Sequence, residues 1–123
     1  MPNELELLHE WKNRLGLNDW VIELESNCKP EDMDLEDCDG CSTYMEVRKI
    51  ARIQIVDPET RSLNIVPFDF EMILVHELMH LKTCMLEEGT DWESLQLRTL
   101  HVLVNDMARA LVDAKRSKQK KEK

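Results

Sequence analysis

The stretch His76-Glu77-Leu78-Met79-His80 carries the strongest structural signal in this 123-residue sequence. Residues four apart on an α-helix lie one turn apart on the same face, so the imidazoles of His76 and His80 can reach one metal ion. Glu77 lies about 100° round the helix from His76, where it can accept a proton from a metal-bound water without competing as a ligand. The pattern therefore predicts a helix that carries a metal site. The alternative is a helix whose two histidines are only hydrogen-bonded core or surface residues.

The residues around this stretch favour a buried helix. Pro67-Phe68-Asp69 offers a stop followed by an N-cap candidate, and Glu71 places a negative charge in the first turn. From residue 70 to 85 the sequence is apolar nearly all round the helix, which predicts burial. Buried imidazole and carboxylate groups need partners, and one metal ion would satisfy all three of them.

The rest of the chain alternates between helical and strand patterns. These patterns predict a helix over 4–15, strands over 19–24, 42–47 and 50–56, the helix over 70–85, and a long final helix that begins at a capping box over 90–93. The acidic segment 26–42, which includes Pro30 and Gly40, predicts a loop. This order predicts an α+β domain in which a small, mostly antiparallel sheet packs on the histidine-bearing helix and on the long C-terminal helix.

Length and charge predict one domain, residues 1–114, with a basic C-terminal tail, residues 115–123. The net charge is −9, but the tail has six basic residues and one acidic residue, so residues 1–114 carry −14. We expect the tail to be a solvated, frayed helix end. No nucleic-acid partner is predicted, because the tail lacks interleaved aromatic side chains and the acidic body would repel phosphate.

Neither a membrane partner nor export is predicted. No apolar run approaches the roughly 18 residues that a membrane span requires. The N-terminal residues 1–6 lack the basic and apolar regions of a secretory signal. We therefore expect a cytoplasmic protein.

A third metal ligand is needed beyond His76 and His80, because a catalytic zinc site usually has three protein ligands and one open position for water. His101 is the main candidate, since it lies on the apolar stripe of the final helix, which should pack against the His76 helix. Glu93 is its rival, but it lies about 12 Å from His101 along the helix axis, so the two cannot bind one ion. Further alternatives are Glu87, Glu88 and Asp91. Asn105, one turn beyond His101, is a candidate outer partner of the ligands, although a plain polar contact is the favoured interpretation.

The four cysteines do not predict a second metal site. Cys38 and Cys41 have C-x-x-C spacing and share the acidic loop with Cys28, but a structural zinc site normally takes four ligands. Cys84 lies about 12 Å from His76 along the helix axis, too far to complete that site. We expect ordinary thiols in a reducing compartment and one Zn²⁺ per chain.

Three stretches resemble the small single-domain H-E-x-x-H metallopeptidase-like proteins of bacteria and phages, which are compact relatives of the zincin clan. These stretches are Lys49–Ile55, Leu74–Leu81 and Leu100–Leu111. The resemblance implies a zincin-like domain with a zinc site on the helix pair and an exposed strand beside the cleft that could pair with an extended peptide. The sequence has no H-E-x-x-H-x-x-G-x-x-H continuation, so it does not match the metzincins. It offers His101 where gluzincins have a glutamate.

A zinc-dependent peptidase is the leading functional hypothesis. Zinc would activate a water molecule, and Glu77 would act as the general base in hydrolysis of a peptide or protein substrate. The strand over 50–56 could bind that substrate at its edge, and Tyr44 and Arg52 are candidate oxyanion donors. The alternative is a zinc-stabilised, non-catalytic protein-interaction module, in which the metal only holds two helices together.

Overall fold

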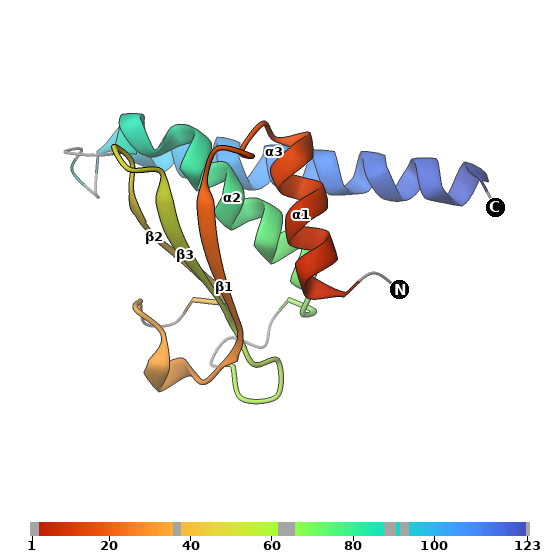
Figure 1. Ribbon diagram of the computed structural model, residues 1–123, viewed down its shortest axis with the longest axis horizontal. Helices are drawn as coiled ribbons and strands as arrows, with labels where there is room; N and C mark the ends of the chain where they lie inside the picture. The colour runs from red at the N-terminus through yellow and green to blue at the C-terminus, as the bar shows by residue number, and fades with distance from the viewer. Residues whose placement is uncertain (1–2, 36–37, 62–65, 88–90, 92–93, 123) are drawn as a thin grey trace.

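The computed structural model describes residues 3–35, 38–61, 66–87, 91 and 94–122. In chain order its elements are α1 (Glu4–Arg14), β1 (Val21–Cys28), the short 3₁₀ helix η1 (Pro30–Asp32), β2 (Gly40–Met45), β3 (Ile50–Val56), α2 (Phe70–Glu87) and α3 (Leu95–Glu122). The three helices lie together over one face of the three-stranded sheet (Figure 1). The predicted α+β class is confirmed. No described helix is both long and apolar enough to cross a bilayer.

The sheet is mixed, so the prediction of a mostly antiparallel sheet is wrong. Its strand order is β1-β3-β2; β3 pairs antiparallel with β2 and parallel with β1. The hairpin formed by β2 and β3 places its second strand beside β1. Alternation of apolar residues predicts which face a strand buries, but not which strands become neighbours. The predicted peptide-binding edge at β3 is also wrong, because β3 is the central strand and β2 is an edge strand.

Helix α2 is the central element, in contact with β2, β3, α1 and α3. Its sequence is apolar nearly all round because it is covered on more than one side, by the sheet and by the other helices. The predicted burial of this helix is confirmed, since Leu74, Val75 and Leu78 are fully buried. The N-cap prediction is also confirmed, because Asp69 Oδ1 accepts a hydrogen bond from the backbone N–H of Met72 at 3.2 Å.

The outer face of β3 is less exposed than its alternation suggests. The alternation of β3 places Gln54 on the same face as Arg52, yet only 4% of Gln54 is exposed. Its side chain accepts a hydrogen bond from the backbone N–H of Asp34 (2.9 Å) and donates to Glu25 (3.0 Å). The segment after β1, predicted as a loop, therefore folds back over this face and is held there by an amide side chain.

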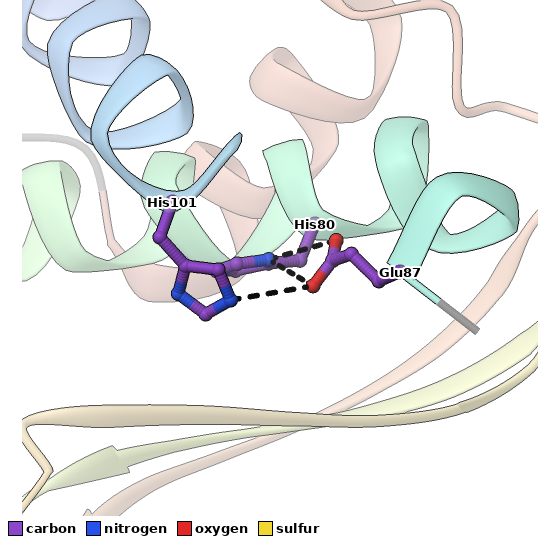
Figure 2. A group of neighbouring side chains, drawn as sticks. All are labelled: His80, Glu87 and His101. Atoms are coloured by element: carbon purple, nitrogen blue, oxygen red, sulfur yellow. Dashed lines mark hydrogen bonds and ion pairs between the residues drawn. The ribbon is translucent and has the colours of Figure 1, made fainter. Parts of the chain in front are cut away.

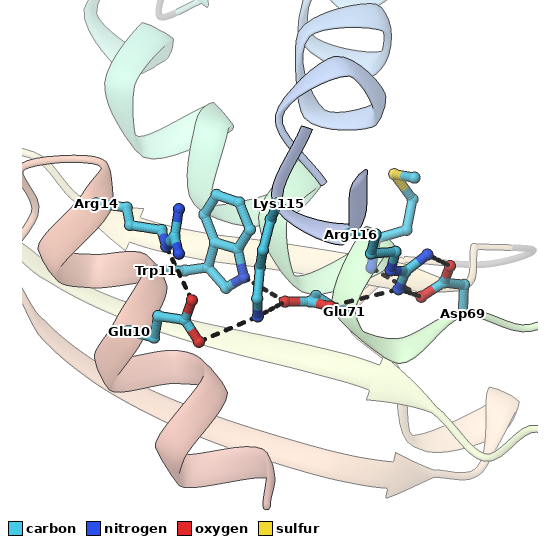
Figure 3. Close-up of polar contacts among 8 residues, drawn as sticks. Glu10, Trp11, Arg14, Asp69, Glu71, Lys115 and Arg116 are labelled. Carbon is cyan, nitrogen blue, oxygen red and sulfur yellow. Dashed lines mark hydrogen bonds and ion pairs between the residues drawn. The ribbon is translucent and has the colours of Figure 1, made fainter. Parts of the chain in front are cut away.

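Helix α3 is continuous through residue 122, so the predicted domain boundary at 114/115 falls inside it. Lys115 is buried: its ammonium group pairs with Glu71 and with Glu10 Oε1 (3.0 Å) and lies 5.7 Å from the centre of the Trp11 ring. Trp11 Nε1 in turn donates to Glu71 Oε2 at 2.7 Å. Figure 3 shows how these side chains join α1, α2 and α3.

Arg116 extends this junction to the start of α2. Its guanidinium donates to both carboxylate oxygens of Asp69, at 2.7 and 2.9 Å, and lies 3.4 Å from Glu71 Oε1 (Figure 3). We call the seven residues Glu10, Trp11, Arg14, Asp69, Glu71, Lys115 and Arg116 the helix clasp. The expectation of a solvated tail therefore fails for its first two basic residues, which pack against the folded domain.

Acidification is expected to weaken the helix clasp. The Arg116 guanidinium holds the pKa of Asp69 below its usual value. Because the pKa is lower in the folded state, the pair stabilises the fold above about pH 4 and loses this contribution as the pH falls through the folded-state pKa. Asp69→Asn keeps an N-cap side chain but should lower stability at pH 7 by about 0.2–1 kcal/mol, the range measured for solvent-accessible ion pairs.

Thermal unfolding between pH 7 and pH 3 measures this contribution. The difference in Tm between the wild type and Asp69→Asn should be present at pH 7 and should shrink as the pH falls below about 4. Asp113→Asn, on the exposed face of α3, is the charge-matched control and should follow the wild type. A constant difference across the whole pH range would contradict a charge-dependent clasp.

Candidate metal centre

The predicted site residues surround a pocket of about 750 Å³. Helix α2 contributes His76, Glu77 and His80, α3 contributes His101, and β2 forms the opposite wall. All four residues that the sequence singled out therefore line this one pocket. The structure adds one residue kept only as a minor alternative, Glu87 at the end of α2.

His76 and His80 approach each other as their helical spacing predicts. Their Nε2 atoms lie 3.2 Å apart, close to the separation of two ligands that each bind a tetrahedral zinc ion at about 2.0–2.1 Å. Burial and the neighbouring His80 lower the pKa of His76 to about 4, although a hydrogen bond between His76 and Asn105 opposes them. His76 is therefore neutral at pH 7, which is the form that binds metal. Asn105 contacts the candidate site through this hydrogen bond with His76.

His80 faces a different partner with its other ring nitrogen. Its Nδ1 lies 3.0 and 3.1 Å from the two carboxylate oxygens of Glu87 (Figure 2). Burial alone would lower the pKa of His80, but the Glu87 carboxylate outweighs it and the pKa is raised. Burial acts in the opposite direction on Glu87, yet hydrogen bonds with His80 and Thr83 lower the pKa of that carboxyl. The two groups thus stabilise each other's charged forms.

His101 reaches this cluster from α3, the helix that the sequence predicted. Its ring centre lies 5.1 Å from that of His80, and its Nε2 lies 3.8 Å from Glu87 Oε1 (Figure 2). Among the described residues, His80, Glu87 and His101 offer ligand atoms that all lie within 4.8 Å of one another. The predicted ligand His76 is not part of this group, and Glu87 takes its place. The rival ligands Glu88 and Glu93 lie outside the described residues, and Asp91 is exposed.

Glu77 is buried beside the histidines. Only 7% of it is exposed, and its Oε1 accepts a hydrogen bond from Ser42 Oγ at 2.8 Å. Burial raises the pKa of this carboxyl. Sequence reasoning missed Ser42, although strand alternation places it on the same face of β2 as Gly40 and Tyr44. What the sequence could not predict is that this face of β2 packs against α2.

Gly40 allows β2 to approach α2 closely. A Cβ atom at this position would lie 2.6 Å from Ile73 Cγ2 and 3.0 Å from Glu77 Oε2. Only glycine fits this contact without displacing its neighbours, so Gly40 sets the spacing that lets Ser42 reach Glu77.

Gly40→Ala is therefore expected to destabilise the fold by about 1–3 kcal/mol, the usual cost of overpacking. Urea unfolding measures the effect. The cost should shrink in an Ile73→Ala background, because that change removes the atom that stands closest to the new methyl group. Strictly additive free energies of unfolding in this double-mutant cycle would contradict the close contact.

The cysteines contribute to the pocket wall but form no cross-link. No disulfide joins the four of them, all of which lie in the described part of the chain. Cys38 and Cys41 line the pocket on the β2 side, and burial raises the pKa of the Cys41 thiol. A raised pKa keeps this thiol protonated at neutral pH, the form that binds metal poorly.

Comparison of the chain with protein-family models, with curated proteins and with solved structures gives no match. The chemistry of the site itself therefore has to carry the functional argument. Three imidazoles and a carboxylate are ligands that Zn²⁺ commonly takes in proteins, so the side chains gathered here fit that ion.

Proposed function

We propose that this protein is a zinc-dependent metallopeptidase with a zincin-like fold. His76, His80 and His101 are the proposed ligands, Glu77 is the general base, and the substrate is a peptide or protein. One observation carries the proposal: two imidazole Nε2 atoms 3.2 Å apart stand beside a buried carboxylate, in a pocket bounded by an edge strand. Zinc bound there would lower the pKa of a coordinated water and polarise a carbonyl group.

Glu77 is suited to move a proton during hydrolysis. Its raised pKa makes it a stronger base than an exposed carboxylate, and a base works best when its pKa lies close to the working pH. It would accept a proton from the attacking water and pass it to the departing amine. The hydrogen bond from Ser42 fixes one carboxylate oxygen, which leaves the other for the proton.

Strand β2 is suited to hold an extended peptide. It is an edge strand, and its residues 40–44 line the pocket. A peptide could add to this edge through backbone hydrogen bonds, with its scissile bond beside the histidines. Tyr44 is the favoured oxyanion donor, since it lies on the same face of β2 as Ser42, whereas Arg52 is held by Asp34 at 2.9 Å.

The second candidate function is the zinc-stabilised interaction module. It is favoured by the position of the ligands on two helices, His80 on α2 and His101 on α3. A metal bound by both would join these helices whether or not it performs chemistry. Glu77 favours the peptidase, because a purely structural site needs no base beside its ligands.

Removal of the metal separates the two functions. The zinc-loaded protein would be incubated with a peptide library, and products would be read by mass spectrometry before and after chelation. For a peptidase we expect cleavage that stops on chelation and returns with zinc, while the circular dichroism spectrum is retained. A fold that collapses on chelation, together with absence of cleavage, would identify the module instead.

A further inference from the structure

We propose that Glu87 is the positioning residue of the metal centre. Its carboxylate holds a proton on Nδ1 of His80, so that Nε2 keeps its lone pair and faces His76. This inference rests on the proposed zinc site, but it assigns a role that the H-E-x-x-H pattern does not contain.

The two ring nitrogens of His80 have different partners. Nδ1 lies 3.0 and 3.1 Å from the oxygens of Glu87, and Nε2 lies 3.2 Å from Nε2 of His76. An ionised carboxylate can only accept hydrogen bonds, so Nδ1 must be the donor. In a neutral imidazole the proton on Nδ1 leaves Nε2 as the nitrogen that can bind metal.

Glu87 is itself held in place. Thr83 Oγ1 donates to Glu87 Oε2 at 2.5 Å, and only 12% of the Glu87 side chain is exposed. Thr83 and Glu87 are one turn apart on α2, and Glu87 follows His80 by seven residues, about two turns. The three side chains therefore form a row on one face of the helix, and the row ends at the metal-binding imidazole.

The geometry favours a positioning role for Glu87 over a ligand role between His76 and His80. Glu87 stands on the Nδ1 side of His80, whereas His76 stands on the Nε2 side. These two nitrogens lie on different sides of the ring, so the carboxylate that bonds to Nδ1 stands across His80 from His76, although it could also hold an ion together with His80 and His101. Glu87 Oε1 also lies 3.8 Å from Nε2 of His101 (Figure 2), so the same carboxylate contacts rings from both helices.

Two substitutions test the role. Glu87→Ala should lower zinc affinity by about 10–100-fold, the usual effect of losing a partner that orients a ligand. Glu87→Gln should lose less, because its amide oxygen can still accept a hydrogen bond from Nδ1. Zinc affinity would be measured by chelator competition, with Asp113→Asn as the control for charge. In the metal-free protein, at a pH high enough for His80 to be neutral, ¹⁵N NMR would show His80 as the Nδ1–H tautomer in the wild type and as a mixture in Glu87→Ala.

Three results would overturn the inference. The first is unchanged affinity and an unchanged His80 tautomer in folded Glu87→Ala. The second is an equal loss in the Ala and Gln variants, well above 100-fold, with an altered visible spectrum of the Co²⁺-substituted protein; this would make Glu87 a ligand. The third applies if Glu87→Ala does not fold and Thr83→Val is used in its place. Full zinc affinity and an unchanged His80 tautomer in Thr83→Val would then overturn the inference. A wild type that binds no zinc would defeat the proposed function, yet the tautomer would still decide the role of Glu87.

Discussion

Replacing Glu77 by Gln is expected to reduce peptide hydrolysis by about 10²–10⁴-fold, the usual contribution of a general base, with zinc still bound. Gln has the same shape as Glu and can still accept the hydrogen bond from Ser42. It cannot accept a proton, so the substitution removes the chemistry and leaves the packing of α2 against β2 intact. Initial rates of peptide cleavage and zinc content on the same preparations measure the two properties separately.

The same substitution should stabilise the metal-free protein. The pKa of Glu77 is higher in the folded state than in the unfolded state, so ionised Glu77 costs stability as the pH rises above its unfolded value of about 4.3. A neutral amide has no such cost. We expect Glu77→Gln to raise the Tm of the metal-free protein at pH 7, and this gain should disappear below about pH 4.

Glu59→Gln is the matched control, because it makes the same chemical change at an exposed position outside the pocket. It should leave hydrolysis and Tm unchanged. Undiminished hydrolysis in Glu77→Gln would rule out the base and the proposed mechanism. Loss of zinc from that variant would show instead that the carboxylate supports the metal.

We expect the wild type to bind about one zinc ion per chain and His101→Ala to lose it. The loss of affinity should exceed the roughly 10–100-fold effect of losing an orienting partner, because a direct ligand is removed and His76 and His80 alone are left. Elemental analysis after dialysis against a weak chelator would measure the stoichiometry, and the hydrolysis of peptides should fall with it.

The chain supplies its own control, because its fourth histidine lies elsewhere. His9 is exposed on α1 and lines no part of the metal pocket. His9→Ala should retain zinc and Tm. If His101→Ala retains zinc, the third ligand is Glu87 or Glu93 and not His101. If the wild type and both variants all lack zinc, the histidine spacing is a coincidence.

Local patterns predicted the helices well, because a cap or an apolar stripe depends on residues only a few positions apart. The capping box of Asn3 and Glu6 and the N-cap at Asp69 are both present. His101 was placed correctly near the site because the apolar stripe of α3 fixes which face meets α2. The strand order was beyond such reasoning, since it depends on which segments meet in space.

The other differences between prediction and structure also come from contacts that form only when distant segments meet in space. Lys115 seemed solvated because its partners, Glu71 and Glu10, are 44 and 105 residues away in the sequence. The sequence favours Glu93 over Glu87 as an alternative third ligand, although the seven-residue spacing places Glu87 and His80 on one face of α2. Ser42 carried no signal of its own, because its role exists only where β2 crosses Glu77.

The helix clasp fixes the position of helix α3 at a point that is remote from the candidate metal centre. Lys115 follows His101 by fourteen residues on one unbroken helix, a span of about 21 Å at 1.5 Å per residue. Contacts of Lys115 and Arg116 hold the C-terminal part of helix α3 against α1 and the start of α2, and the same helix carries His101, the proposed third ligand. A chain that ends after residue 114 would keep His76, His80 and His101. It would lose the ion pairs of Lys115 and Arg116, and with them the contacts that fix the position of His101.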